Sequence, residues 1–153
     1  MKRFVTVFAV VANLVLADAV SKELAAGHLK SSPPVEVVGG FFSLAYVENR
    51  GCAWGMLQGQ VWPLAVFAMA ALAFLVWKRK SVFGDGKAEA VAEVVMYAGI
   101  IGNMIDRVCR GYVIDMFDFY WRSHHFPCFN LADAYISAAA FLIVVCSFGK
   151  RTS

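Results

Sequence analysis

Four long apolar runs constrain this chain more than any other feature of its sequence. They cover residues 4–20, 61–77, 88–105 and 131–148 of a chain of 153 residues that is 60% hydrophobic. A transmembrane helix needs about 20 mostly apolar residues, with a range of roughly 17–25. We therefore predict a membrane α-helical fold and not a water-soluble domain, with four transmembrane helices in a single domain over residues 1–153.

The basic residues gather in three segments: before the first run, between the second and third runs, and after the fourth. These segments share one side of the membrane in a four-span topology. Because short cytoplasmic loops are rich in Lys and Arg, we expect both termini in the cytoplasm and the other two loops outside. We interpret the basic segments as topology signals and lipid contacts, and we expect no nucleic-acid partner. Their residues are Lys2, Arg3, Lys78, Arg79, Lys80, Lys87, Lys150 and Arg151.

The first run also has features of a cleavable signal peptide, namely a basic start, an apolar stretch and the small-residue triplet Ala17-Asp18-Ala19. An acid inside the cleavage motif argues against removal. Removal would also strip away part of the charge pattern that sets the topology. We therefore interpret the run as a retained span.

The two predicted outer loops differ in character. In the first, residues 35–38 and 41–47 are β-branched and aromatic and are separated by Gly39-Gly40, which predicts a β-hairpin. In the second, residues 110–128 are rich in aromatic side chains. We expect this second loop to lie along the outer membrane interface.

Polar side chains that interrupt or border the apolar runs converge at one depth, near the predicted outer face. A charge deep within a span costs about 2.5–3.5 kcal/mol, so ionisable residues there indicate a functional site. The residues are Asp18 at the end of the first run, Asn103, Asp106 and Arg107 at the end of the third, Asp115 in the outer loop, and Asn130 and Asp133 at the start of the fourth.

Structural roles account for some of these residues. Asn130 is expected to cap the fourth helix, and Asp133 in its first turn suits the helix dipole. Asp106 and Arg107 are expected to pair with each other and close the third helix. Asp115 and Asp133 have no local basic partner, so a structural role explains them less well.

Two carboxylates in a partly dry apolar site cannot both ionise easily, so one of them keeps a proton. Such a pair supplies a general base that activates water and a general acid that polarises a carbonyl. This chemistry would hydrolyse a peptide bond at the membrane surface. It needs no metal, no cofactor and no nucleophilic side chain.

Several motifs together resemble the signature of the lipoprotein signal peptidase (signal peptidase II) family. They are GNMIDR (102–107), VIDMF (113–117), FNLAD (129–133) and ENRGCAWG (48–55), with Asp18 and Lys22 near the end of the first run. The resemblance implies that Asp115 and Asp133 form the catalytic dyad. It implies supporting or substrate-binding roles for Asn49, Asn103, Asp106, Arg107, Asn130, Asp18 and Lys22.

The resemblance also implies an activity and a location. The family consists of intramembrane aspartic endopeptidases of the bacterial inner membrane. They remove the signal peptide from prolipoproteins just before a diacylglyceryl-modified cysteine, without metal or cofactor. A small extracytoplasmic β-cradle and an interfacial helix are expected, with the active site near the outer leaflet and the protein acting as a monomer. Cys52 and Cys128 stand where the family usually has Ala.

Other classes of function are less well supported. A disulfide-generating oxidoreductase would need paired reactive cysteines, and no C-x-x-C motif is present. A proton or cation path would need polar groups across the bilayer, yet the inner halves of the runs hold only Asn13 and Glu93. Asp118 with His124 and His125 could suggest a metal site, but we expect them to make interfacial loop contacts.

Overall fold

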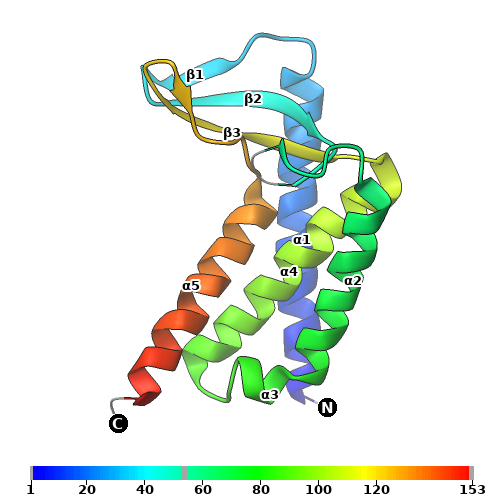
Figure 1. Ribbon diagram of the computed structural model, residues 1–153, viewed down its shortest axis with the longest axis vertical. Coiled ribbons are helices and arrows are strands. Elements are labelled where there is room, and N and C mark those ends of the chain that lie inside the picture. Colours follow the sequence, from blue (N-terminus) through cyan, green and yellow to red (C-terminus); the bar gives the residue numbers. More distant parts are fainter. Residues whose placement is uncertain (1, 53–54, 152–153) are drawn as a thin grey trace.

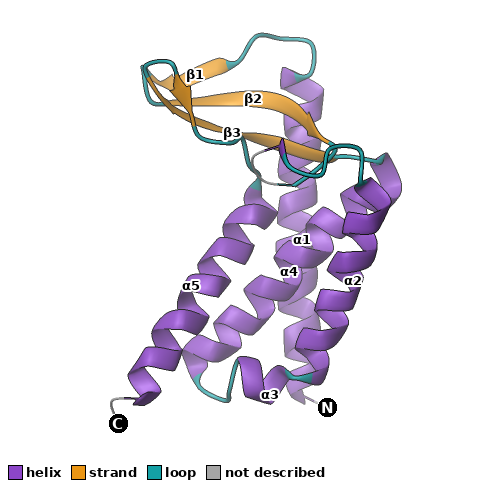
Figure 2. Ribbon diagram, in the orientation of Figure 1, coloured by secondary structure: helices purple, strands orange, loops and turns teal. Residues whose placement is uncertain are grey.

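The computed structural model describes residues 2–52 and 55–151 and shows a bundle of helices with an antiparallel sheet over one end (Figure 1). Figure 2 shows how completely the helices and strands are segregated into these two parts. Both ends of the chain lie at the end of the bundle away from the sheet, on opposite sides of it in this view. The long helices are α1 (Lys2–Leu29), α2 (Val61–Trp77), α4 (Lys87–Arg110) and α5 (Leu131–Arg151), and the short α3 (Arg79–Val82) lies between α2 and α4.

All four predicted apolar runs are helical. By length and composition, Arg3–Leu29, Lys87–Arg110 and Leu131–Phe148 could each cross a membrane, and Val61–Trp77 is an apolar helix of 17 residues. The fold is therefore mostly helical, with three to four candidate spans. The first helix continues well past its predicted end at residue 20, as far as Leu29.

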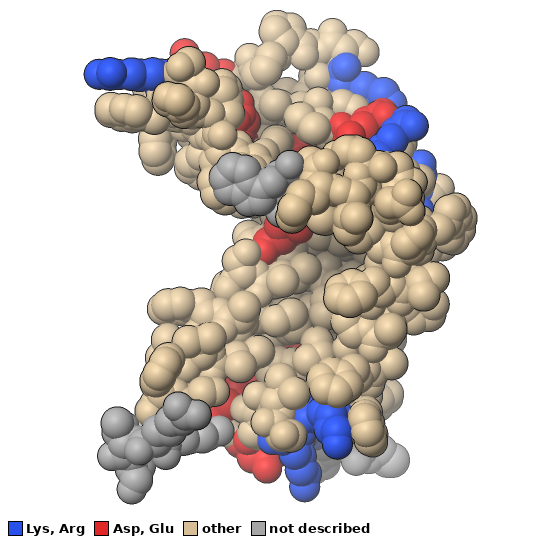
Figure 3. Space-filling view, viewed as in Figure 1, with Lys and Arg blue, Asp and Glu red and all other residues tan. Residues whose placement is uncertain are grey.

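The outer faces of the bundle are apolar. Phe4, Phe67 and Phe141 are each at least 67% exposed, and large apolar residues are exposed along all four long helices. In the space-filling view, charged side chains gather at the two ends of the molecule and leave a largely uncharged belt between them (Figure 3). A water-soluble monomer rarely exposes so much contiguous apolar surface, whereas lipid would cover it.

Helix α4 is the centre of the bundle and contacts α1, α2 and α5. Two glycines on this helix permit a close approach to its neighbours. A Cβ added at Gly99 would lie 2.5 Å from the carbonyl oxygen of Ala132, and one added at Gly102 would lie 2.6 Å from Oδ2 of Asp18. Small residues at helix contacts allow such backbone approach in membranes.

The sheet has the order β1-β2-β3-β4, and all its pairings are antiparallel. Its strands are β1 (Val35–Val38), β2 (Phe42–Asn49), β3 (Val113–Trp121) and β4 (His124–His125). The predicted hairpin is confirmed as β1 and β2, with Gly40 at a φ of 73° in the turn. The second outer loop, for which no strand was predicted, forms β3 and β4 and completes the sheet.

The sheet is fixed to the bundle through the last turns of α1. Ala25 of α1 packs with Ile114 and Met116 of β3 in a buried cluster. This contact explains why α1 continues beyond the apolar run, since its last turns pack against the sheet. The expected interfacial helix is not confirmed: the described residues between β2 and α2 form bends and turns, with Gly55 in a 3₁₀ conformation, and Ala53 and Trp54 lie outside the described residues.

Candidate functional site

A fully buried lysine lies where α1 and α4 meet the sheet. The ammonium nitrogen of Lys22 is 2.7 Å from Oδ2 of Asp18, 3.0 Å from Oδ2 of Asp106 and 3.1 Å from Oδ1 of Asn103. An ammonium group has three donors and no acceptor, so these contacts use all its donors. A buried charge is tolerated only when it is paired and hydrogen-bonded in this way.

The partner of Asp106 differs from the prediction. Asp106 accepts hydrogen bonds from Lys22 and, at 3.0 Å, from Nε of Arg110, one turn further along α4. Arg107 instead donates to the carbonyl oxygens of Asn103 (3.2 Å) and Gly51 (3.0 Å). The predicted ion pair between Asp106 and Arg107 was therefore wrong, because adjacent residues of a helix do not face each other. Arg107 ties the loop after β2 to α4.

Asp18 connects α1 to the start of α5. Its Oδ1 accepts a hydrogen bond of 2.9 Å from the backbone N–H of Ala132, while its Oδ2 contacts Lys22. The carboxylate of Asp18 therefore accepts a hydrogen bond from one of the N–H groups in the first turn of α5 that have no partner within the helix. The close approach of α4 at Gly102 leaves just enough room for this carboxylate.

Asn130 caps α5, as predicted. Its Oδ1 accepts a hydrogen bond of 3.0 Å from the backbone N–H of Asp133, and its own N–H donates to Oδ2 of Asp133 over 3.3 Å. This is a reciprocal capping arrangement. The side-chain nitrogen of Asn130 remains free to donate to Oδ1 of Asp115 (2.7 Å) and Oδ1 of Asn103 (3.1 Å). One residue thus connects both carboxylates of the expected dyad.

Asp115 is the more enclosed of the two carboxylates. It belongs to β3, is 1% exposed and accepts a hydrogen bond on each oxygen, from Asn130 and, at 2.9 Å, from Nδ2 of Asn49. Burial, followed by the nearby charge of Asp133, raises the pKa of Asp115 to about 7 against the opposing effect of these hydrogen bonds. Near neutral pH this group is therefore poised to hold a proton.

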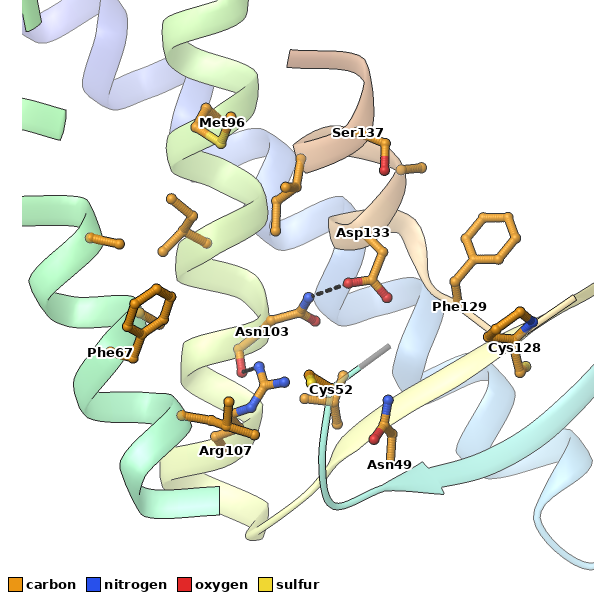
Figure 4. A pocket seen from close by; sticks show the side chains of 18 of the residues that line it. Asn49, Cys52, Phe67, Met96, Asn103, Arg107, Cys128, Phe129, Asp133 and Ser137 are labelled. Atoms are coloured by element: carbon orange, nitrogen blue, oxygen red, sulfur yellow. Dashed lines mark hydrogen bonds between the residues drawn. The ribbon is translucent and has the colours of Figure 1, made fainter. Parts of the chain in front are cut away.

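Asp133 lies in the first turn of α5 and faces a cavity (Figure 4). Its Oδ1 accepts a hydrogen bond of 2.7 Å from Nδ2 of Asn103. The orientation of the Asn103 amide follows from its other contacts. Lys22 can only donate, so it requires the oxygen of Asn103 on its side and turns the NH₂ group toward Asp133.

The nine residues predicted for the site thus form one connected network of hydrogen bonds and ion pairs. Among the described residues, no buried side-chain nitrogen or oxygen lacks a hydrogen-bond partner. The members are Asp18, Lys22, Asn49, Asn103, Asp106, Arg107, Asp115, Asn130 and Asp133.

Two cavities adjoin this network. The first has a volume of about 790 Å³ and lies between α2, α4 and α5, with apolar residues such as Phe67, Met96 and Ile100 in its wall and Asp133 at its polar end. Figure 4 shows Asn103, Arg107 and Asp133 gathered at this end. The second, of about 540 Å³, lies against the sheet and includes Asp115. An apolar cavity with a few convergent polar groups is the usual form of a binding site.

The family of this chain follows from sequence comparison. A sequence profile described as Signal peptidase (SPase) II matches residues 10–149. The chain belongs to the signal peptidase II family.

Similar proteins span nearly the whole chain. A lipoprotein signal peptidase of Symbiobacterium thermophilum is 37% identical over 137 residues, which cover 90% of this chain and 89% of that protein. One from Bacillus pumilus is 33% identical over 141 residues, covering 91% of each. A solved structure of a bacterial membrane enzyme, at 30% identity, superposes with a TM-score of 0.82 over 97% of this chain and 90% of that one.

Cys52 and Cys128 each line both cavities. Both are free thiols in the structure. Burial, followed by the charge of Asp115, raises the pKa of the Cys128 thiol to about 12. A thiol held in its protonated form is a poor nucleophile, so Cys128 is suited to lining the cavity and not to attacking a substrate.

Some residues of the site were not singled out from the sequence. Gly99 and Gly102 permit the approach of α4 to α5 and Asp18, and their G-x-x-G spacing was the available signal. Nδ1 of His125 and Oδ1 of Asp118 lie 2.9 Å apart and join β4 to β3, so these residues belong to strands and not to a loop as expected. Within residues 2–52 and 55–151 no group of three or more His, Cys, Asp or Glu side chains is placed to hold a metal ion.

Proposed function

We propose that this chain is an intramembrane aspartic endopeptidase that removes the signal peptide from diacylglyceryl-modified prolipoproteins and cleaves just before the lipidated cysteine. Membership of the signal peptidase II family supports a peptidase acting on prolipoproteins. The observation that carries the aspartic mechanism is the bridge of Asn130 between Asp115 and Asp133 at the end of an apolar cavity.

The two carboxylates are not equivalent, and this suggests their roles. Asp115 is buried, its pKa is raised to about 7, and it keeps the proton of the pair. Asp133, with Asn103 donating to it, acts as the general base that takes a proton from water. The water then attacks the scissile carbonyl, while Asp115 donates its proton to the developing oxyanion. Asp133 next passes the proton that it took from water to the leaving nitrogen, and Asp115 recovers a proton from the hydroxyl as the carbonyl re-forms and the C–N bond breaks.

The network behind the dyad holds it in place. Lys22 fixes the amide of Asn103, and Asn103 and Asn130 each donate to a carboxylate. Because reacting groups must be positioned closely, and a misplacement of about 1 Å can cost roughly a hundredfold in rate, this support contributes to catalysis without touching the substrate. Asn49, which donates to Asp115 and lines both cavities, is suited to contact the substrate.

The proposed topology has four spans and one domain, with both termini in the cytoplasm. It rests on the basic residues near the termini and between α2 and α4. The sheet, at the opposite end of the bundle, then lies outside, and the dyad lies near the outer leaflet of the bacterial inner membrane. A signal-peptide helix could enter the apolar cavity sideways from the lipid, and the diacylglyceryl group would set its register. Action as a monomer stays a prediction.

The proposal is tested with purified protein in detergent and a diacylglyceryl-modified precursor peptide. Asp115→Asn and Asp133→Asn should each abolish cleavage while the thermal unfolding transition remains. Each change keeps the size of the side chain but removes the titratable group. Asp85→Asn, on the loop before α4, is the matched control and should cleave at the wild-type rate. Substantial cleavage by either variant would contradict the assignment of Asp115 and Asp133 as the catalytic dyad.

A further inference from the structure

The second cavity is not used by the mechanism above. Its volume is about 540 Å³, and it lies between β2, β3, β4 and the segment before α5. A larger share of its wall is polar than in the apolar cavity, and Glu48, Asp118 and His125 line it beside Asp115. Its size falls within the range of about 300–1,000 Å³ that is typical of ligand pockets.

The two cavities meet at the dyad. Asn49, Cys52 and Cys128 are among the residues that line both of them. Asp133 faces the apolar cavity, and Asp115 faces the polar one. An extended chain that leaves the apolar cavity past Asp133 and Asp115 therefore continues into the polar cavity.

Besides Asp115, two carboxylates lie in the wall of the polar cavity, those of Glu48 and Asp118. The side chain of Asp118 is 15% exposed, accepts a hydrogen bond of 3.2 Å from Oγ of Ser43 and contacts Nδ1 of His125 at 2.9 Å. The cations nearest to Glu48, Lys30 and Arg50, bind it at 3.4 Å and 3.3 Å and do not line the cavity. A cavity walled by carboxylates favours cationic over anionic groups.

We propose that the polar cavity is the subsite for the first residues of the mature lipoprotein, on the carboxyl side of the scissile bond, and that Asp118 makes it selective for charge. A neutral or basic residue after the modified cysteine is accepted, and an acidic one is disfavoured by repulsion from Asp118. The inference rests on the proposed function, because it takes the apolar cavity as the place of the signal peptide.

Three diacylglyceryl-modified precursor peptides test it, identical except that the two residues after the cysteine are Lys, Ser or Asp. The measured quantity is kcat/KM. A partly exposed charge pair changes an equilibrium by up to about fivefold, so we expect the kcat/KM of the wild-type protein to be up to about fivefold higher for the Lys peptide than for the Asp peptide. In Asp118→Asn, the ratio of kcat/KM for the Lys peptide to that for the Asp peptide should fall close to one. This variant should still cleave the Ser peptide.

Glu36→Gln is the matched control, because Glu36 lies on β1 of the same sheet and lines neither cavity. It should keep the wild-type ratio. His125→Ala is a second, independent variant, which leaves Asp118 with Ser43 as its donor. It should widen the preference for the Lys peptide, so the inference stays testable even if Asp118→Asn does not fold.

Three results would overturn the subsite: equal kcat/KM for the three peptides with the wild-type protein, an unchanged ratio in Asp118→Asn, or the same loss of the ratio in Glu36→Gln. Failure of the proposed function gives a different pattern. In that case the wild-type protein cleaves none of the peptides, or Asp115→Asn cleaves the Ser peptide as well as the wild type does.

Discussion

The ammonium group of Lys22 lies 3.1 Å from Oδ1 of Asn103, and Nδ2 of the same amide donates to Asp133 over 2.7 Å. A residue of α1 thus determines which way an amide on α4 faces a carboxylate on α5. The same ammonium group also pairs with Asp18 and Asp106, so one buried cation serves both the stability of the bundle and the geometry of the site.

Replacing Lys22 with Met should therefore destabilise the protein strongly. The change leaves Asp18 without its cation and Asn103 without its orienting donor, and removal of one partner of a buried pair costs about 3–5 kcal/mol. Thermal unfolding in detergent measures this. Lys30→Met is the matched control, since Lys30 is exposed and pairs at the surface with Glu48, and it should cost about 1 kcal/mol or less. Equal shifts in the two variants would contradict the role of Lys22.

The stability of the protein should depend on pH through Asp115. Its pKa is about 7 in the folded protein, against an ordinary value of 3.8. Between these values the folded state binds more protons at this site than the unfolded state, so its contribution to stability falls as pH rises from about 4 to 7. Asn cannot ionise. Asp115→Asn should therefore raise the melting temperature relative to the wild type more at pH 8 than at pH 5, although it removes activity.

Melting curves of the wild type and of Asp115→Asn at pH 5 and pH 8, in one detergent, are sufficient to check this pH dependence. A difference in melting temperature that is the same at pH 5 and pH 8 would mean that Asp115 does not change its protonation in this range.

The sequence predicted the positions of the helices well, because four uncharged or nearly uncharged runs leave few alternatives. It predicted the β1–β2 hairpin from β-branched residues around Gly39-Gly40. It did not predict β3, since the run from Val113 to Phe117 is apolar except for Asp115 and shows no regular alternation. Four of these five residues, from Val113 to Met116, are buried in the structure, as in a strand covered on both faces, and such a run cannot be assigned by periodicity alone.

The membership of the site was predicted more accurately than its connections. Asp106 and Arg107 were expected to pair because they are adjacent, yet the helix directs Asp106 to Arg110, four residues on. The i, i+4 spacing was present in the sequence and would have indicated this pair. The contact of Lys22 with Asn103, 81 residues apart, depends on how α1 packs against α4. No local pattern carries that information.

The packing at Gly102 provides a prediction of its own. Gly102→Ala places a Cβ about 2.6 Å from Oδ2 of Asp18, and overpacking of this kind costs about 1–3 kcal/mol. Gly27→Ala is the same substitution in α1, at a position where an added Cβ meets nothing within 4 Å. Alanine is favoured over glycine in a helix by roughly 0.5–1 kcal/mol, so this control should be neutral or stabilising. Unfolding curves that move in the same direction for both variants would show that α4 can shift away from Asp18 at little cost.

The last prediction concerns the orientation of the protein in the membrane. If the sheet is extracytoplasmic, the turn between α1 and β1 faces the outside and the turn before α4 faces the cytoplasm. Ser32 and Asp85 are exposed residues of these two turns. Each can be changed to Cys in a variant whose four native cysteines are replaced by Ala. That variant should remain active, because the proposed chemistry needs no thiol.

A membrane-impermeant thiol reagent applied to spheroplasts should label Ser32→Cys and spare Asp85→Cys, and permeabilised cells should show labelling of both. The positive-inside pattern requires this result, since Lys78, Arg79 and Lys80 lie in the same loop as Asp85. Labelling of Asp85→Cys alone in spheroplasts would place the dyad at the cytoplasmic face, on the wrong side for a precursor whose modified cysteine lies at the outer leaflet, and the proposed function would fail.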